Sequence, residues 1–144
     1  MASGPRHVFY EKLNAILAEA DFDDFVEELC EPYYAEDGRP GIPPGVYFRM
    51  MYLGYFEGID SQRGIAWRCH DSLSIKHFLG YQQHEATPDH SSLSRIRTRL
   101  PLEVFHEVHV CVLQLLIDHK LVDGTTVGVD ATLLEANAAM KSIV

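Results

Sequence analysis

The sequence predicts a mainly α-helical, helix-turn-helix-like bundle followed by the first β-strand of a further domain. The chain has 144 residues, of which 47% are hydrophobic, and this is enough for one domain with a packed core. Up to about residue 120, apolar residues recur at intervals of three and four, the helical period. From Thr126 to Leu133 polar and apolar residues alternate, which is the period of a strand, and the turn residues Asp123 and Gly124 precede it.

Two helices are expected before the first loop. Residues 8–20 carry apolar side chains at helical spacing, and Asp21 is placed to cap a second helix that Pro32 ends. Six acids follow one another here at a spacing that matches no cation-binding loop, and we expect them to form a solvated face. They are Asp21, Asp23, Asp24, Glu27, Glu28 and Glu31. Residues 35–45, AEDGRPGIPPG, predict a loop.

Three further helices are expected between residues 46 and 80. Residues 46–58, VYFRMMYLGYFEG, are apolar on nearly every side, which predicts a buried helix. A short helix starts at Ser61, where Ile65 and Trp67 are expected to pack while Arg63 and Arg68 face outward. Asp71 is expected to cap the next helix and Gly80 to end it. Short helices in succession are typical of a helix-turn-helix-like bundle.

The next helix, DHSSLSRIRTRL, carries the candidate binding residues. Pro88 and Asp89 mark its start, and Leu93, Ile96 and Leu100 form its packed face. The candidate DNA-binding residues are Ser91, Ser92, Arg95, Arg97 and Arg99. Hydroxyl and backbone N–H donors at a helix start bind phosphate oxygens, and guanidinium groups bind phosphates or guanine edges. The alternative is an ordinary exposed helix whose arginines serve solubility.

A long helix should follow Pro101, with a buried stripe that includes Leu102, Phe105 and Val108. The letters HEVH at residues 106–109 lack the histidine spacing of a zinc protease, so we expect no histidine-based metal site. Three widely spaced cysteines contain no CxxC pair and are expected to be reduced, mostly buried thiols. They are Cys30, Cys69 and Cys111.

The net charge of −9 argues against a nucleic-acid partner until its distribution is considered. Residues 1–45 hold three Lys and Arg against ten Asp and Glu, and residues 101–144 hold two against six. Residues 46–100 hold seven against five. Because phosphate contacts need positive charge only within about 10 Å, a basic face on this acidic chain is able to bind DNA with strong salt dependence.

Two motifs resemble one family. The segment at residues 129–142, VDATLLEANAAMKS, resembles the start of the catalytic domain of DDE-type insertion-sequence transposases, and residues 87–97, TPDHSSLSRIR, are similar to their PDHSTLSRFR-like signature. The resemblance implies a helical DNA-binding N-terminal domain at residues 1–120. It also implies that residues 121–144 begin a ribonuclease-H-like catalytic domain whose first strand carries the catalytic Asp130.

In such enzymes three carboxylates hold two Mg²⁺ or Mn²⁺ ions for phosphoryl transfer. The chain ends 14 residues after Asp130. We therefore expect the 144 residues to be catalytically inactive and to bind no metal alone. Glu135 would lie on the opposite strand face and is not assigned as a ligand.

The expected partner is double-stranded DNA, in particular transposon terminal inverted repeats, together with a second copy or the remainder of a transposase. The alternatives are a stand-alone helix-turn-helix regulator of transcription and a protein that inhibits a full-length transposase through protein contacts. No stretch has the roughly 18 apolar residues of a membrane span, and no signal peptide is apparent, so we expect a cytoplasmic protein.

Overall fold

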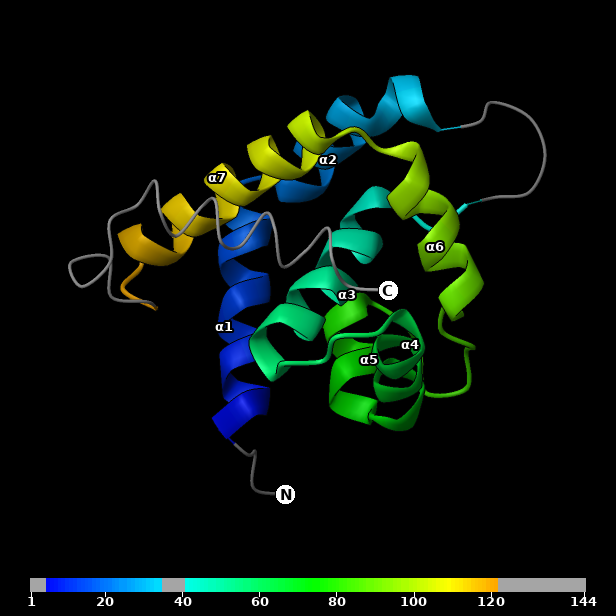
Figure 1. Cartoon of the computed structure of the whole chain (residues 1–144). Coiled ribbons are helices and arrows are strands. Elements are labelled where there is room, and N and C mark those ends of the chain that lie inside the picture. Colours follow the sequence, from blue (N-terminus) through cyan, green and yellow to red (C-terminus); the bar gives the residue numbers. More distant parts are fainter. Residues whose placement is uncertain (1–4, 35–40, 122–144) are drawn as a thin grey trace.

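The helix α3 (Pro44–Glu57) lies at the centre of the molecule, and the other helices pack around it (Figure 1). The structure is a computed structural model and describes residues 5–34 and 41–121. The elements around α3 are α1 (Pro5–Glu19), α2 (Phe22–Cys30), the 3₁₀ turn η1 (Glu31–Tyr33), α4 (Gln62–Asp71), α5 (Leu73–Leu79), α6 (His90–Arg99) and α7 (Leu102–Asp118). The predicted mainly helical class is confirmed for the described residues. The predicted strand at residues 126–133 lies outside them.

The core is built on α3 because almost every residue from Pro44 to Gly54 is buried. Its aromatic rings meet Phe105 of α7 edge to face, with ring centroids 5.7 Å apart for Phe48 and 6.3 Å apart for Tyr47. Such edge-to-face pairs add to the stabilisation that burial alone gives. The all-round apolar pattern of residues 46–58 therefore predicted this helix correctly.

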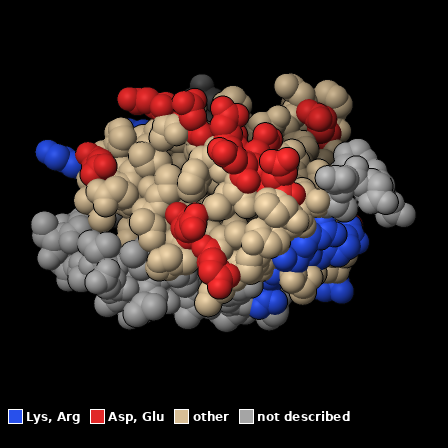
Figure 2. All heavy atoms as spheres, turned by 90° about the horizontal axis from the view of Figure 1, so that it is seen from above, with Lys and Arg blue, Asp and Glu red and all other residues tan. Residues whose placement is uncertain are grey.

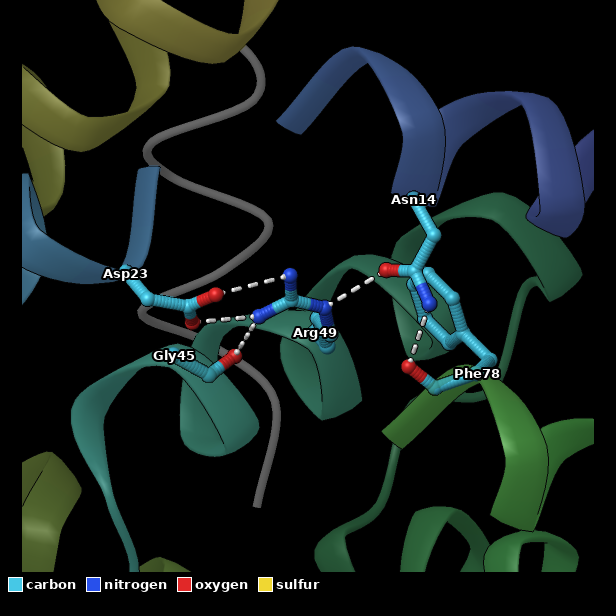
Figure 3. A network of polar contacts seen from close by, with 5 residues as sticks. All are labelled: Asn14, Asp23, Gly45, Arg49 and Phe78. Atoms are coloured by element: carbon cyan, nitrogen blue, oxygen red, sulfur yellow. Dashed lines mark hydrogen bonds and ion pairs between the residues drawn. The ribbon is translucent and has the colours of Figure 1, made fainter. Parts of the chain in front are cut away.

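A buried arginine ties four helices together (Figure 3). Arg49 of α3 is 8% exposed, and its guanidinium donates to both carboxylate oxygens of Asp23 on α2, at 2.8 and 3.3 Å. Its remaining donors go to the side-chain oxygen of Asn14 on α1 at 2.8 Å and to the backbone oxygen of Gly45 at 3.1 Å. Asn14 in turn donates to the backbone oxygen of Phe78 on α5. Every guanidinium nitrogen thus has a partner, which a buried cation requires.

The helix α6 lies at one edge of the molecule and leads through a sharp corner into α7 (Figure 1). The two helices meet at 104°. A hydrogen bond from the Ser94 hydroxyl to the side-chain oxygen of Gln62 joins α6 to α4, which packs against it. Within the described residues no single helix is long and apolar enough to cross a membrane, and the pair α6 and α7 meets that test only when both are counted together across the bend.

Several predicted helix ends are confirmed, the predicted cap Asp71 is wrong, and Asp21 holds its predicted cap position without a side-chain capping bond. Gly58 and Gly80 end α3 and α5 with φ of 68° and 87°, a backbone conformation that glycine adopts without steric cost. Asp71 is the last residue of α4, and the cap of α5 is Ser72, whose hydroxyl accepts the N–H of Ile75. Asp21 occupies the cap position of α2, but its φ of 54° leaves its side chain without a capping bond.

Three side chains lie elsewhere than predicted. Trp67 is 65% exposed, because it follows the buried Ile65 by two residues and so points away from the core. Arg68 does not face outward freely, since its Nε donates to the Glu57 carboxylate at 2.8 Å. Leu102, expected in the buried stripe of α7, is 52% exposed at the first position of that helix. The six acids at residues 21–31 are all exposed, as predicted.

Candidate nucleic-acid interface

The start of α6 is fixed by Asp89, as the sequence predicted. Its carboxylate accepts the backbone N–H of Ser92 at 2.9 Å and the hydroxyl of Ser91 at 2.9 Å. The hydrogen bond from the Ser92 N–H, followed by the two serine side chains, lowers the pKa of Asp89 to about 2. The carboxylate is therefore ionised at neutral pH and occupies the positive end of the helix dipole.

The candidate residues Ser91 and Ser92 are half-buried, and their hydroxyls already have partners within the chain. The Ser91 hydroxyl donates to Asp89, and the Ser92 hydroxyl accepts a guanidinium N–H of Arg95 at 3.1 Å. A negative charge at the helix start also repels a phosphate there. This geometry moves the most favourable position for a phosphate from the first turn of α6 to its later turns.

The later turns of α6 present two exposed arginines. Arg95 and Arg99 are both exposed, and because they are four residues apart they lie on the same side of the helix. Thr98 lies beside them with its hydroxyl bonded to the backbone oxygens of Ser94 and Arg95, at 3.2 and 3.0 Å. The outer face of α6 thus combines two exposed cations with a short side chain that leaves room for close approach.

Arg97 lies differently from the other two arginines. It is half-buried, and its Nε is a buried donor without a hydrogen-bond partner. Burial raises the pKa of Tyr47 in the core, and the positive charge of Arg97 opposes that rise, so the guanidinium lies within electrostatic range of the core tyrosine. The sequence carries the signal for this, since Arg97 follows the buried Leu93 by four residues and precedes the buried Leu100 by three.

Arg99 also acts on a tyrosine near the end of η1. Burial raises the pKa of Tyr34, and Arg99 is one of the charges that influence it. The hydroxyl of Tyr34 donates to the backbone oxygen of Ile42 at 2.9 Å and so stays paired. The C-terminal end of α6 is therefore within electrostatic range of Tyr34, the residue that follows η1.

Lys and Arg side chains gather at the right edge of the face in Figure 2, the side on which Figure 1 shows α6, while Asp and Glu form separate groups elsewhere on this largely uncharged face. Arg63 on α4, the helix that packs against α6, is also exposed. Sequence reasoning placed Arg63 outward but did not include it among the binding residues. The order of the helices does not reveal this contact, because α5 separates α4 from α6 in the sequence.

The predicted catalytic and metal-binding residue Asp130 lies outside the described residues. Within residues 5–34 and 41–121, no three His, Cys, Asp or Glu side chains are close enough together to hold a metal ion. The three cysteines are free, and Cys30 and Cys69 are buried, as predicted. Burial raises the pKa of Cys30 to about 11 and that of Cys69 to about 12, so neither thiol is ionised at neutral pH.

The chain matches a protein-family model. No curated protein and no solved structure matches the chain. Residues 2–99, which run from the N-terminus to the last residue of α6, match the family model of the DUF772 transposase domain. Because the match covers more than half of the sequence, the chain belongs to the DUF772 transposase domain family.

Proposed function

We propose that the chain binds double-stranded DNA through the outer face of α6, as the N-terminal part of an insertion-sequence transposase of the DDE type. The observation that carries the proposal is the pair Arg95 and Arg99, exposed on one side of a helix at the edge of the molecule. An α-helix fits the major groove, where guanidinium groups bind phosphates or guanine edges. The DNA we expect to be bound is the terminal inverted repeat of a transposon.

Local charge supports this proposal despite the overall acidity. Arg95, Arg99 and Arg63 lie on two helices that pack together, and Asp89 is the only acid within α6 and its cap. Arg97 has a different proposed role from Arg95 and Arg99. Its positive charge adds to the electrostatic field at the interface, while its side chain packs toward the core. Ser91 and Ser92 shape the first turn through Asp89 and Arg95.

The test is duplex binding as a function of salt. We expect the double variant Arg95→Ala/Arg99→Ala to bind more weakly and to lower the slope of log K against log salt by about two, since each phosphate contact contributes about 0.9. Lys12→Ala/Lys120→Ala is the matched control. It removes the same two charges from exposed positions on α1 and beyond the end of α7, which lie across the molecule from α6 (Figure 1).

Equal losses in both double variants would mean that net charge and not α6 governs binding, and the assignment of α6 would then be wrong. Strong binding to one palindromic site, with no preference for transposon ends, would instead favour the regulator of transcription. If the chain shows no salt-dependent duplex binding, the remaining hypothesis is a protein that inhibits a full-length transposase through protein contacts.

For the catalytic step we propose that a polypeptide of these 144 residues transfers no DNA strand. Two-metal phosphoryl transfer uses several carboxylates around both ions, and Asp130 supplies one. The assay is Mg²⁺- or Mn²⁺-dependent nicking of transposon-end DNA by the purified polypeptide. Nicking that Asp130→Ala abolishes would overturn this part of the proposal.

A further inference from the structure

A lysine in α5 is buried with its charge. Lys76 is 8% exposed, and its Nζ donates to the backbone oxygens of Gln83 and Glu85, both at 3.0 Å. An ammonium group has three N–H donors, so one remains after these two bonds. The two bonds hold the segment between α5 and α6 against α5.

Lys76 forms no ion pair with another described residue. The ion pairs found there join Arg49 to Asp23 and Arg68 to Glu57. The nearby carboxylate of Glu85 instead accepts the backbone N–H of Gln82 at 2.7 Å. Two carbonyl dipoles solvate an ammonium group in part, but a buried charge without an opposite charge stays unfavourable.

The same lysine lines a pocket of about 390 Å³ at the end of α5. His77, Tyr81, Gln82 and Gln83 line it as well, so the wall offers amide and imidazole donors together with an aromatic ring. Tyr81 is half-buried, and burial, followed by the negative charge of Glu85, raises the pKa of its hydroxyl, so the ring is neutral at neutral pH. The volume lies in the range of small-molecule sites, about 300 to 1,000 Å³.

We propose that this pocket binds a phosphate group, whose negative charge neutralises Lys76. The remaining ammonium N–H and the side-chain amides of Gln82 and Gln83 are donors suited to phosphate oxygens. Tyr81 and His77 provide flat surfaces for a base or sugar attached to that phosphate. A cation is disfavoured by the lysine, and a neutral ligand would leave its charge uncompensated. This site is separate from the outer face of α6 and does not depend on DNA binding there.

The phosphate has two possible sources, a small phosphate monoester and the backbone of a nucleic acid. Amide chemical shifts of the full chain test both, with inorganic phosphate, thymidine 5′-monophosphate and duplex DNA added in turn. We expect saturable shifts at Gly80, Tyr81, Gln82 and Gln83 with inorganic phosphate, with a dissociation constant on the order of 1 mM. Larger effects from the mononucleotide identify a small-molecule site, and larger effects from the duplex identify the nucleic-acid backbone.

Two variants separate binding from folding. Lys76→Gln removes the charge and should weaken phosphate binding by about tenfold or more, as expected for a hydrogen bond to a charged group. Gln82→Ala/Gln83→Ala keeps both backbone oxygens that Lys76 contacts, those of residues 83 and 85, and should also weaken binding while the fold stays intact. If the wild-type protein shows no saturable shift at these residues, or if Lys76→Gln shows the same shifts, the pocket does not bind phosphate. Neither result bears on the role of α6, because inorganic phosphate alone is the ligand.

Discussion

At the scale of single residues, His109 shows how burial decides the chemistry of a side chain. It lies on α7, is 4% exposed, and stacks on Tyr52 of α3 with ring planes 6° apart. The Tyr52 hydroxyl and the His109 Nδ1 are 2.9 Å apart, within hydrogen-bond distance. Burial, with a smaller contribution from His106, lowers the pKa of His109 from its ordinary 6.5 to about 4. The ring is therefore neutral in the folded protein at physiological pH.

This shift predicts a loss of stability in acid. Above pH 6.5 His109 is neutral in both the folded and the unfolded chain, so its contribution is intact there. As the pH falls from 6.5 to about 4, the unfolded chain takes up the proton first, and the free energy of unfolding decreases by up to about 3 kcal/mol. Urea unfolding at a series of pH values measures this decrease in the free energy of unfolding. The double variant Tyr52→Phe/His109→Phe keeps the ring stack and should lose this dependence; an unchanged pH dependence would contradict the assignment.

Asp89 is predicted to stabilise α6 while weakening DNA binding. Asp89→Asn keeps an N-cap oxygen for the Ser92 N–H and removes the negative charge, so we expect unchanged folding and an affinity for duplex DNA higher by about two- to fivefold at low salt. Asp89→Ala should instead lower the free energy of unfolding by about 1 kcal/mol. Thermal unfolding and duplex titration separate the two effects. Equal DNA affinity for wild type and Asp89→Asn would place the bound phosphate far from the start of α6.

At the scale of helices, the local sequence pattern predicted where most helices lie. The packing of helices against one another determined the side-chain partners, which the local pattern does not reveal. Gly58, Gly80 and Asp89 act on the backbone beside them, so their roles as helix ends follow from the residue type. Arg49 needs an acid because it lies in a buried helix, but nothing local identifies Asp23, which is 26 residues away. The inward position of Arg97 was readable from its spacing to Leu93, whereas the partner of Arg68 was not.

The contact between α2 and α3 depends on a glycine. A Cβ atom at Gly45 would lie 1.8 Å from the Oδ1 of Asp23 and 3.0 Å from a guanidinium nitrogen of Arg49. Gly45→Ala should therefore displace the carboxylate from the buried arginine, and we expect a loss of about 2 to 4 kcal/mol in the free energy of unfolding. Denaturant unfolding measures it.

The matched control for that substitution is Gly41→Ala, whose Cβ would meet, among the described residues, the ring of Tyr34 at 3.7 Å. This distance is an ordinary van der Waals contact, so we expect a change below about 0.5 kcal/mol. If both alanine variants unfold at the wild-type denaturant concentration, the ion pair between Asp23 and Arg49 does not hold α2 against α3.

At the scale of the whole molecule, charge is divided between an acidic part and a basic edge. The sequence predicted that residues 46–100 carry the positive charge, but not that α4 and α6 bring Arg63 and Arg95 onto helices that pack together. The acids of α2 are exposed, and Figure 2 shows Asp and Glu side chains in separate groups while Lys and Arg gather at the edge where Figure 1 shows α6. The field of such a molecule orients an approaching polyanion, with the basic edge foremost.

This division predicts that the acids of α2 oppose DNA association from a distance. Asp24, Glu27 and Glu28 are exposed, so their amide substitutions Asp24→Asn, Glu27→Gln and Glu28→Gln should leave folding unchanged. At low salt the triple variant should associate with duplex DNA several-fold faster than wild type. Near 0.5 M salt the difference should vanish, because screening then acts within about 4 Å. A gain that persists at high salt would mean that α2 contacts DNA directly, and the interface would then extend beyond α6.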